Sequence, residues 1–262
     1  MSNLPIGMFD SGVGGTSIWK EIHRLLPHEH FVYLADSRNA PYGEKSSDEI
    51  LRLSIKNTEF LLNKGCKLIV VACNTATTNA IDYLRNTYKI PFIGIEPAIK
   101  PAALNSKSKR VGVLATKGTL SSTLFHSTAQ NHAEGIEIIE QQGKGLVELI
   151  EKGALHSVST RALLKEFLKP MIAKDIDYLV LGCTHYPYLI PIIKELLPEH
   201  VKIIDSGEAV ARQTKAILEK FGNLNKTLDF GTHQFFINTD VKVLEPFVLG
   251  VDAQKEVRFL DF

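Results

Sequence analysis

The sequence predicts an α/β protein built from two similar halves, each with a mostly parallel sheet flanked by helices. Short aliphatic segments alternate with helical segments along the whole chain of 262 residues. The aliphatic segments are almost continuously apolar, which is typical of parallel strands that are buried on both faces. Two of these segments also recur, with the residues that follow them, 105 and 110 residues further along the chain.

Eight predicted strands give the order of the sheet elements along the chain. Each is a short run of apolar, often β-branched residues between turn or helix signals. They cover residues 5–9, 31–35, 68–72, 91–95, 110–115, 136–140, 178–182 and 201–204.

Three helices between these strands are clearest, and they cover residues 46–63, 160–173 and 207–221. The first begins with a capping box formed by Ser46 and Glu49 and ends at Gly65. The second places its apolar residues on one face. Pro170 is expected to bend or end this second helix, because proline lacks the backbone N–H of a regular helix.

Polar residues directly follow seven of the predicted strands. In open α/β sheets, ligands bind outside the carboxyl ends of the strands. The side chains at these ends therefore define where to look for a site, and they are Asp10, Asp36, Cys73, Glu96, Thr116, Cys183 and Asp205.

Two strand ends resemble each other in sequence. The strand at 68–72 is followed by Cys73, and the strand at 178–182 is followed by Cys183. In both, a small residue precedes the cysteine and two polar residues follow it. We interpret this as two α/β halves with equivalent strand ends. If the halves face each other, the two thiols face each other across a cleft.

Composition argues against several classes of protein. Lys and Arg number 30 against 29 Asp and Glu, so we expect no nucleic-acid partner and no binding to a membrane surface. No apolar run approaches the ~18 residues of a membrane span, and the N-terminus lacks the features of a signal peptide. The three cysteines, Cys66, Cys73 and Cys183, are too few for a disulfide scaffold and indicate reduced thiols in a cytoplasmic protein.

A glycine-rich segment, Asp10-Ser-Gly-Val-Gly-Gly, follows the first strand. It is not a dinucleotide-binding fingerprint, because the third glycine of that pattern would fall at Ser17. Its backbone N–H groups can approach an anion at the start of a helix. The alternative is a tight turn that requires positive φ. We favour the ligand-binding loop.

The thiols of Cys73 and Cys183 have the chemistry of an acid/base pair. A thiol with a pKa of ~8.5 needs about 2 kcal/mol to ionise at pH 7. A helix N-terminus supplies ~0.3–1 kcal/mol, or up to ~2 when partly buried, and a protonated His185 can supply the rest. One thiolate and one thiol on opposite faces of a carbon acid invert its configuration without a cofactor. Cys66 has no polar neighbours in sequence and is interpreted as structural.

Four motifs, in this order and spacing, resemble those of glutamate racemases over essentially the whole chain: Asp10-Ser-Gly-Val-Gly-Gly, Pro41-Tyr-Gly, Ala72-Cys-Asn-Thr-Ala and Gly182-Cys-Thr-His-Tyr-Pro. The resemblance implies a cytoplasmic racemase with no cofactor and no metal, which supplies D-glutamate for peptidoglycan and commonly forms homodimers. It also implies two pseudo-symmetric domains with the active site in the cleft between them. The first would comprise residues 1–97 and 208–262, and the second residues 98–207.

By this resemblance, Cys73 removes the proton from D-glutamate and Cys183 removes it from L-glutamate. The assisting groups fall on Asp10, His185 and Glu151, with Glu148 as the alternative to Glu151. The resemblance places the substrate contacts at Asp10, Ser11, Tyr42, Gly43, Asn74, Thr75, Thr184 and His185.

The chain also departs from the family pattern. Ser37-Arg38-Asn39 replaces smaller or apolar residues, and Phe125 stands where tyrosine is common. We expect these differences to change contacts at the rim of the site and not the reaction. Because the chain begins almost at its first strand, we also expect no activation by a cell-wall precursor.

Three alternatives stay open at this point. The first is an aspartate racemase or a related two-cysteine enzyme, which the size of the pocket would distinguish. The second is a zinc enzyme with Cys73, Cys183 and His185 as ligands, since Cys₂His is a known catalytic zinc set. The third is a two-lobed binding protein that holds an amino acid without removing its α-proton.

Overall fold

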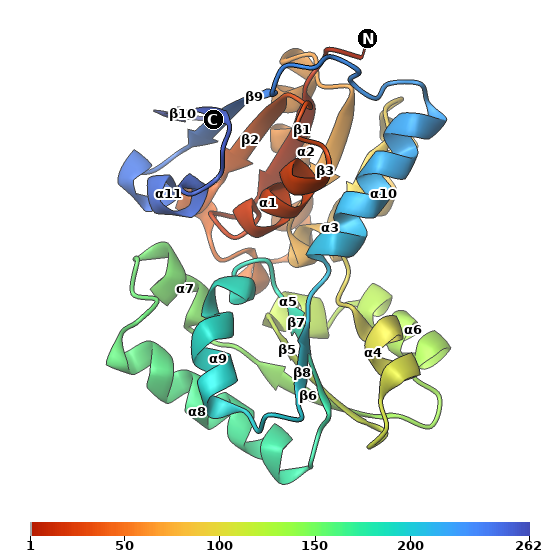
Figure 1. The fold of residues 1–262 in the computed structure, drawn as a ribbon, viewed down its shortest axis with the longest axis vertical. Coiled ribbons are helices and arrows are strands. Elements are labelled where there is room, and N and C mark those ends of the chain that lie inside the picture. Colours follow the sequence, from red (N-terminus) through yellow and green to blue (C-terminus); the bar gives the residue numbers. More distant parts are fainter. Residues whose placement is uncertain (1) are drawn as a thin grey trace.

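The computed structural model of this protein describes residues 2–262, which form two lobes around two parallel sheets (Figure 1). The first lobe contains β1 (Ile6–Asp10), β2 (Phe31–Ala35), β3 (Leu68–Val71), β4 (Phe92–Gly94), β9 (Thr232–Ile237) and β10 (Gln254–Phe259). The second lobe contains β5 (Arg110–Ala115), β6 (Glu137–Gln142), β7 (Tyr178–Gly182) and β8 (Lys202–Ile204). Every strand pairing is parallel, which confirms the predicted fold class.

The two sheets repeat the same strand order. The first sheet runs β10-β9-β2-β1-β3-β4, and the second runs β6-β5-β7-β8. Without β9 and β10, each sheet places its first strand between its second and third, with its fourth at the edge. Thus β3 and β7 occupy equivalent positions, and the sequence similarity around Cys73 and Cys183 corresponds to a structural repeat.

All eight predicted strands are present, with shifts of one or two residues at some ends, but β9 and β10 were missed. Strands are predicted from the sequence as nearly continuous apolar runs. β10 lies at the edge of its sheet and is largely exposed on both faces, and β9 begins with alternating exposed and buried residues. Neither strand therefore carries the apolar signature of a central strand.

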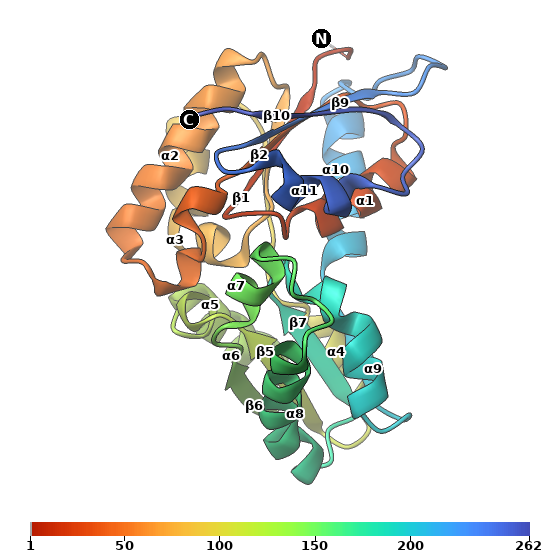
Figure 2. The ribbon, with the colours of Figure 1, turned by 90° about the vertical axis from the view of Figure 1, so that its left-hand side faces the viewer.

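Helices cover both faces of each sheet. α2 (Ser47–Asn63) and α3 (Asn74–Thr87) lie on one side of the first sheet, and α1 (Thr16–Leu25) and α10 (Gly207–Lys220) lie on the other (Figure 2). The remaining helices are α4 (Ile99–Asn105), α5 (Lys117–Leu120), α6 (Thr123–His132), α7 (Leu146–Glu151), α8 (Val158–Ala173), α9 (Ile190–Leu196) and α11 (Val241–Val248). Short 3₁₀ turns are η1 (Ser37–Asn39), η2 (Tyr42–Glu44) and η3 (Tyr186–Leu189). None of the helices formed by residues 2–262 is long and apolar enough to cross a membrane.

The helix signals in the sequence are mostly confirmed. The Ser46 side chain accepts a hydrogen bond from the N–H of Glu49 and caps α2, as the capping box predicts. Pro170 was expected to bend or end its helix, but α8 continues through it to Ala173. Pro170 and Glu166, whose carbonyl loses its helical partner, both lie on the exposed face. Water can therefore satisfy that carbonyl.

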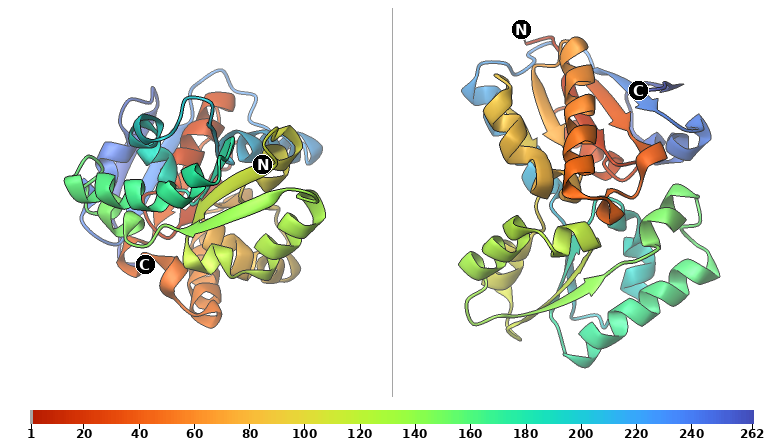
Figure 3. Two further views of the ribbon diagram at one scale, coloured as in Figure 1. Left: turned by 90° about the horizontal axis from the view of Figure 1, so that it is seen from below. Right: turned by 180° about the vertical axis from the view of Figure 1, so that it is seen from behind.

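The chain crosses between the lobes twice, at residues 95–98 and again at residues 205–206, and the lobes follow one another along the long axis of the molecule (Figure 3). The two crossings touch, because the Ser206 hydroxyl donates to the carbonyl of Glu96. From the membership of the two sheets we propose the domain division 1–97 plus 208–262 and 98–207. In this arrangement the carboxyl ends of β3 and β7 approach each other at the boundary between the lobes.

Candidate active site

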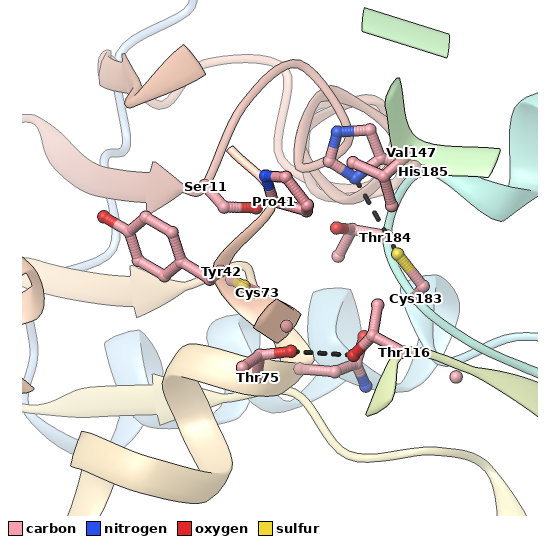
Figure 4. Close-up of a pocket in the computed structure, with 13 residues that line it drawn as sticks. Ser11, Pro41, Tyr42, Cys73, Thr75, Thr116, Val147, Cys183, Thr184 and His185 are labelled. Carbon is pink, nitrogen blue, oxygen red and sulfur yellow. Dashed lines mark hydrogen bonds between the residues drawn. The ribbon is translucent and has the colours of Figure 1, made fainter. Parts of the chain in front are cut away.

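One pocket lies between the lobes and is lined from both of them (Figure 4). Its lining residues are Ser11, Pro41, Tyr42, Gly43, Cys73, Asn74 and Thr75 from the first lobe, and Thr116, Val147, Gly182, Cys183, Thr184 and His185 from the second. In the described conformation its volume is about 10 Å³, which accommodates the centre of about one water molecule. A substrate the size of an amino acid needs more space than this, so its entry requires the pocket to widen.

The two predicted cysteines lie on opposite sides of this pocket (Figure 4). Both are almost completely buried, with Cys73 5% and Cys183 7% exposed. Cys73 is the N-cap of α3, and its sulfur accepts a hydrogen bond from the N–H of Ala76 at 3.5 Å. Cys66 is also buried but lies outside the pocket. The strand repeat thus brings one thiol from each lobe to the same small space.

Cys73 is a neutral thiol in this conformation. Burial raises the pKa of Cys73 well above its ordinary value, and the nearby Asp10 carboxylate and Cys183 raise this pKa further. The N–H of Ala76 lowers the same pKa, but by less. In this closed conformation, the desolvation of Cys73 therefore outweighs the effect of the helix N-terminus on its pKa.

Cys183 has a different environment, because His185 lies next to it. The sulfur is 3.8 Å from Nδ1 of the imidazole. Burial alone would lower the pKa of His185, but its hydrogen bonds with Cys183 and Glu151 raise this pKa well above the ordinary value. A protonated imidazole thus places a positive charge beside the Cys183 sulfur. Among residues 2–262, no such positive group lies beside Cys73, whose charged neighbour is the Asp10 carboxylate.

Glu151, and not Glu148, is the carboxylate that contacts the histidine. Its Oε1 lies 2.6 Å from Nε2 of His185 and also accepts a hydrogen bond from the N–H of Val13 at 2.7 Å. Glu148 lines neighbouring surface cavities and makes no side-chain hydrogen bond among the described residues. Of the two carboxylates that the sequence left open, Glu151 is the one in contact with His185.

Asp10 is completely buried and does not line the pocket, but it contacts Thr184, which does. Its Oδ2 accepts hydrogen bonds from the N–H groups of Gly12 at 3.3 Å and Gly15 at 2.9 Å, and its Oδ1 accepts one from the Thr184 hydroxyl at 3.3 Å. Burial raises the pKa of Asp10 to about 6, although the charge of His185 and the N–H of Gly15 lower it. The carboxylate thus holds together loops from both lobes.

The pKa of Asp10 predicts an acidic limb in the pH profile. Because the ionised carboxylate accepts the hydrogen bonds of Gly15 and Thr184, we expect kcat/KM to increase as the pH rises through about 6. In Asp10→Asn this limb should disappear, and kcat should fall. The measurement is kcat/KM between about pH 5 and 8 for both proteins. An unchanged limb in Asp10→Asn would assign the titration to another group.

The glycines of the first loop are required for a reason that the sequence did not reveal. None of Gly12, Gly14 and Gly15 has positive φ, and the N–H groups of Gly12 and Gly15 bind Asp10 instead of facing an external anion. A Cβ atom on Gly12 would lie 1.9 Å from Oε1 of Glu151, and one on Gly14 would lie 2.2 Å from Nδ1 of His185. These two glycines make room for the side chains that approach from the second lobe.

The side-chain amide of Asn74 lines the pocket without a hydrogen-bond partner among the described residues. The side chain is buried, and neither its nitrogen nor its oxygen has a hydrogen-bond partner among the described residues. Leaving both groups of a buried amide unpaired costs free energy, of the order of 1–3 kcal/mol for each group. A bound molecule with polar groups would remove this cost. No Lys or Arg is among the described residues that line the pocket.

Most of the residues predicted from sequence line this pocket. The exceptions are Asp10 and Glu151, which do not line the pocket but contact the lining residues Thr184 and His185. The lining residues that were not assigned to the site are Pro41, Thr116, Val147 and Gly182. Thr116 was detectable, since it directly follows a strand, and its Oγ1 lies 2.9 Å from Oγ1 of Thr75 across the lobe boundary (Figure 4). Val147 carries no chemical signal in the sequence.

A zinc site has no support in this geometry. Among residues 2–262, no three His, Cys, Asp or Glu side chains are arranged to hold a metal ion. The three proposed ligands, Cys73, Cys183 and His185, share the pocket but do not form such a cluster.

Comparisons with known proteins agree with these features. Residues 6–214 match the family model described as Asp/Glu/Hydantoin racemase. The glutamate racemase of Ectopseudomonas mendocina is 45% identical over 260 residues, which are 98% of each chain. A solved glutamate racemase isoform of Bacillus anthracis has a TM-score of 0.86 and 32% identity over 100% of this chain and 99% of that one. The Escherichia coli glutamate racemase, solved with L-glutamate and the activator UDP-MurNAc-Ala, has a TM-score of 0.86 and 34% identity over 98% of both chains.

Proposed function

This chain belongs to the Asp/Glu/hydantoin racemase family and racemises glutamate, and we propose that it does so with two bases, the thiols of Cys73 and Cys183. The observation that carries the proposal is the shared pocket, which receives one buried thiol from each lobe. A single acid/base group would have to reach both faces of the α-carbon. Two groups at equivalent strand ends reach one face each.

The proposed order of proton transfers follows from the different surroundings of the two thiols. With L-glutamate, the Cys183 thiolate beside protonated His185 removes the α-proton, and the neutral Cys73 thiol returns a proton to the opposite face. The product is D-glutamate, with Cys183 now a thiol and Cys73 a thiolate. D-Glutamate reacts by the reverse sequence. Because the pocket is closed and nearly dry, the charges that develop during the transfer interact strongly with the groups that line it.

The assisting residues act on separate thiols in this proposal. Glu151 and His185 form a hydrogen-bonded pair that stabilises the charge on Cys183. Asp10 interacts electrostatically with Cys73 and accepts a hydrogen bond from Thr184, which lines the pocket. Neutral hydrogen-bonding groups bind the substrate carboxylates. The side chains available for this are those of Ser11, Asn74 and Thr75, with the backbone of Tyr42, Gly43 and Thr184, since the hydroxyls of Tyr42 and Thr184 donate to Asp36 and Asp10.

The unpaired amide of Asn74 gives a testable consequence for binding. In Asn74→Ala, we expect KM for both enantiomers to increase about tenfold or more, because a hydrogen bond to a charged carboxylate is lost. The value of kcat should change less, since this contact is made in the ground state and in the transition state alike. Initial rates at varied L- and D-glutamate concentrations measure both parameters. A fall in kcat at constant KM would contradict a binding role.

The biological setting is part of the proposal. The enzyme would act in the cytoplasm as a homodimer and would supply D-glutamate for peptidoglycan. Its reaction would need no cofactor and no metal ion.

Circular dichroism of the substrate tests the function directly. We expect the signal of L-glutamate to decay to zero with the purified protein, and that of D-glutamate to decay to zero from the opposite sign. L-Aspartate serves as the control substrate and should keep its signal. Racemisation of aspartate without glutamate would contradict the proposal, as would an activity that chelators abolish and zinc restores. A protein that binds glutamate but leaves its signal unchanged would be a binding protein.

A further inference from the structure

Ser37 lies outside the cysteine pocket, but its hydroxyl contacts the carboxylate that orients His185. Ser37 Oγ donates to Oε2 of Glu151 at 2.8 Å across the boundary between the lobes. The other oxygen, Oε1, accepts from the N–H of Val13 at 2.7 Å and lies 2.6 Å from Nε2 of His185. Each carboxylate oxygen therefore has its own donor. The group cannot rotate without losing at least one of these hydrogen bonds.

The loop that carries Ser37 is held by buried hydrogen bonds. It begins directly after Asp36, whose completely buried carboxylate accepts from the Tyr42 hydroxyl and from Nδ2 of Asn238, each at 2.5 Å. Oδ1 of Asn238 in turn accepts from the N–H of Arg38 at 2.9 Å. Ser37 thus lies between two residues that are fixed in place, and its hydroxyl reaches Glu151 from a defined position.

From the sequence, we expect residues 37–39 to affect only contacts at the rim of the site. The structure connects this segment to Cys183 through two intermediates, Glu151 and His185. No corresponding contact joins Ser37 to Cys73 among the described residues. Any effect of Ser37 on proton transfer should therefore be specific to the Cys183 side.

We propose that Ser37 is a positioning residue for racemisation, and that its hydroxyl fixes the carboxylate of Glu151 so that Glu151 orients His185 against Cys183. The inference rests on the proposed function, because it concerns proton transfer at Cys183. Without the hydroxyl, Oε2 loses this donor, and only the contacts of Oε1 with Val13 and His185 hold the carboxylate. The imidazole then loses its fixed orientation, and proton transfer at Cys183 slows.

The kinetic signature of this role is directional. Because the two enantiomers are equally stable, kcat/KM falls equally in both directions and does not reveal which thiol is affected. The primary isotope effect of α-deuterated substrate does reveal it. Cys183 breaks the bond in L-glutamate, so a slower step at Cys183 increases that isotope effect. In D-glutamate, Cys73 breaks the bond to the α-deuterium. Slower reprotonation from Cys183 then makes that bond cleavage less rate-limiting, so the isotope effect measured with D-glutamate decreases.

Three variants test the proposal. In Ser37→Ala, we expect kcat/KM to fall about tenfold, since a hydrogen bond to a charged group is lost, with the isotope effect rising for L-glutamate and falling for D-glutamate. Ser37→Thr keeps the hydroxyl and should restore most of the activity. Thr239→Val is the matched control, because Thr239 lines the same cavity as Ser37 and Glu151 but has no hydrogen-bond partner among the described residues. It should behave like the unmodified protein.

The possible failures are distinguishable. Absence of glutamate racemase activity in the unmodified protein would overturn the proposed function, and this inference with it. With an active unmodified protein, three results would overturn the inference alone. They are unchanged kinetics in Ser37→Ala, isotope effects that shift alike in both directions, and an equal loss in Thr239→Val.

Discussion

Replacement of Cys73 or Cys183 by alanine is expected to lower glutamate racemisation about 10³-fold or more in both directions. A positioned acid or base contributes roughly 10²–10⁴-fold to a proton transfer. In every turnover one thiol acts as the base and the other as the acid, so neither can compensate for the other. Their burial also limits replacement by water, because only about one water molecule fits the pocket.

The structural role of Cys73 must be separated from its chemical role. Its sulfur caps α3 by accepting from the N–H of Ala76, so Cys73→Ala removes a cap as well as a base. Cys73→Ser keeps an acceptor at the cap but replaces the thiol by a much weaker acid. We expect both variants to be inactive and Cys73→Ser to be the more stable, as measured by thermal unfolding.

Cys66→Ala is the matched control for these variants. Cys66 is buried like the other two cysteines, but it lies outside the pocket. We expect Cys66→Ala to racemise glutamate at close to the normal rate. Substantial activity in a folded Cys73 or Cys183 variant would remove that residue from the mechanism. Complete loss of activity in a folded Cys66→Ala would contradict the structural interpretation of Cys66.

A second large loss of racemisation is expected when a methyl group is added at Gly14. In Gly14→Ala, the added Cβ would lie 2.2 Å from Nδ1 of His185, closer than any normal contact. The imidazole must then move away from Cys183, which lies 3.8 Å from the same nitrogen. We expect racemisation to fall about 10²-fold or more, because the charge beside Cys183 is misplaced. Initial rates in both directions measure the effect.

Gly135→Ala controls for the general cost of replacing glycine. Gly135 has a φ of +72° and nothing within 4 Å of an added Cβ, so alanine there strains the backbone without a clash. It should lower stability while leaving catalysis nearly unchanged. A Gly14→Ala protein with normal kcat would mean that His185 need not occupy its described position.

The sequence predicted the central part of each sheet because burial on both faces leaves an apolar signature. The edge strand β10 lacks that signature, since most of its side chains are exposed and polar. It is identifiable only through its pairing with β9, a contact made between distant parts of the fold.

The site shows the same limit. The two cysteines were predictable, because a thiol after a buried strand occurs twice at equivalent places. The choice between Glu148 and Glu151 depends on which side chain of α7 reaches His185, and the sequence does not contain that distance. The glycines of the first loop, and Ser37, were misread for a related reason. Their role comes from side chains of the other lobe that approach them in space.

Two thiols on opposite faces of the substrate form the central claim, and isotope incorporation from solvent tests it most directly. In D₂O, the Cys73 thiol exchanges its proton for deuterium before L-glutamate binds, while Cys183 binds this substrate as a thiolate. Cys183 then removes protium from L-glutamate, and Cys73 delivers deuterium to the other face. During early turnover, the α-deuterium should therefore appear in the newly formed D-glutamate, while the remaining L-glutamate stays unlabelled. The reverse should hold from D-glutamate, and equal early labelling of both enantiomers would contradict the two-base assignment.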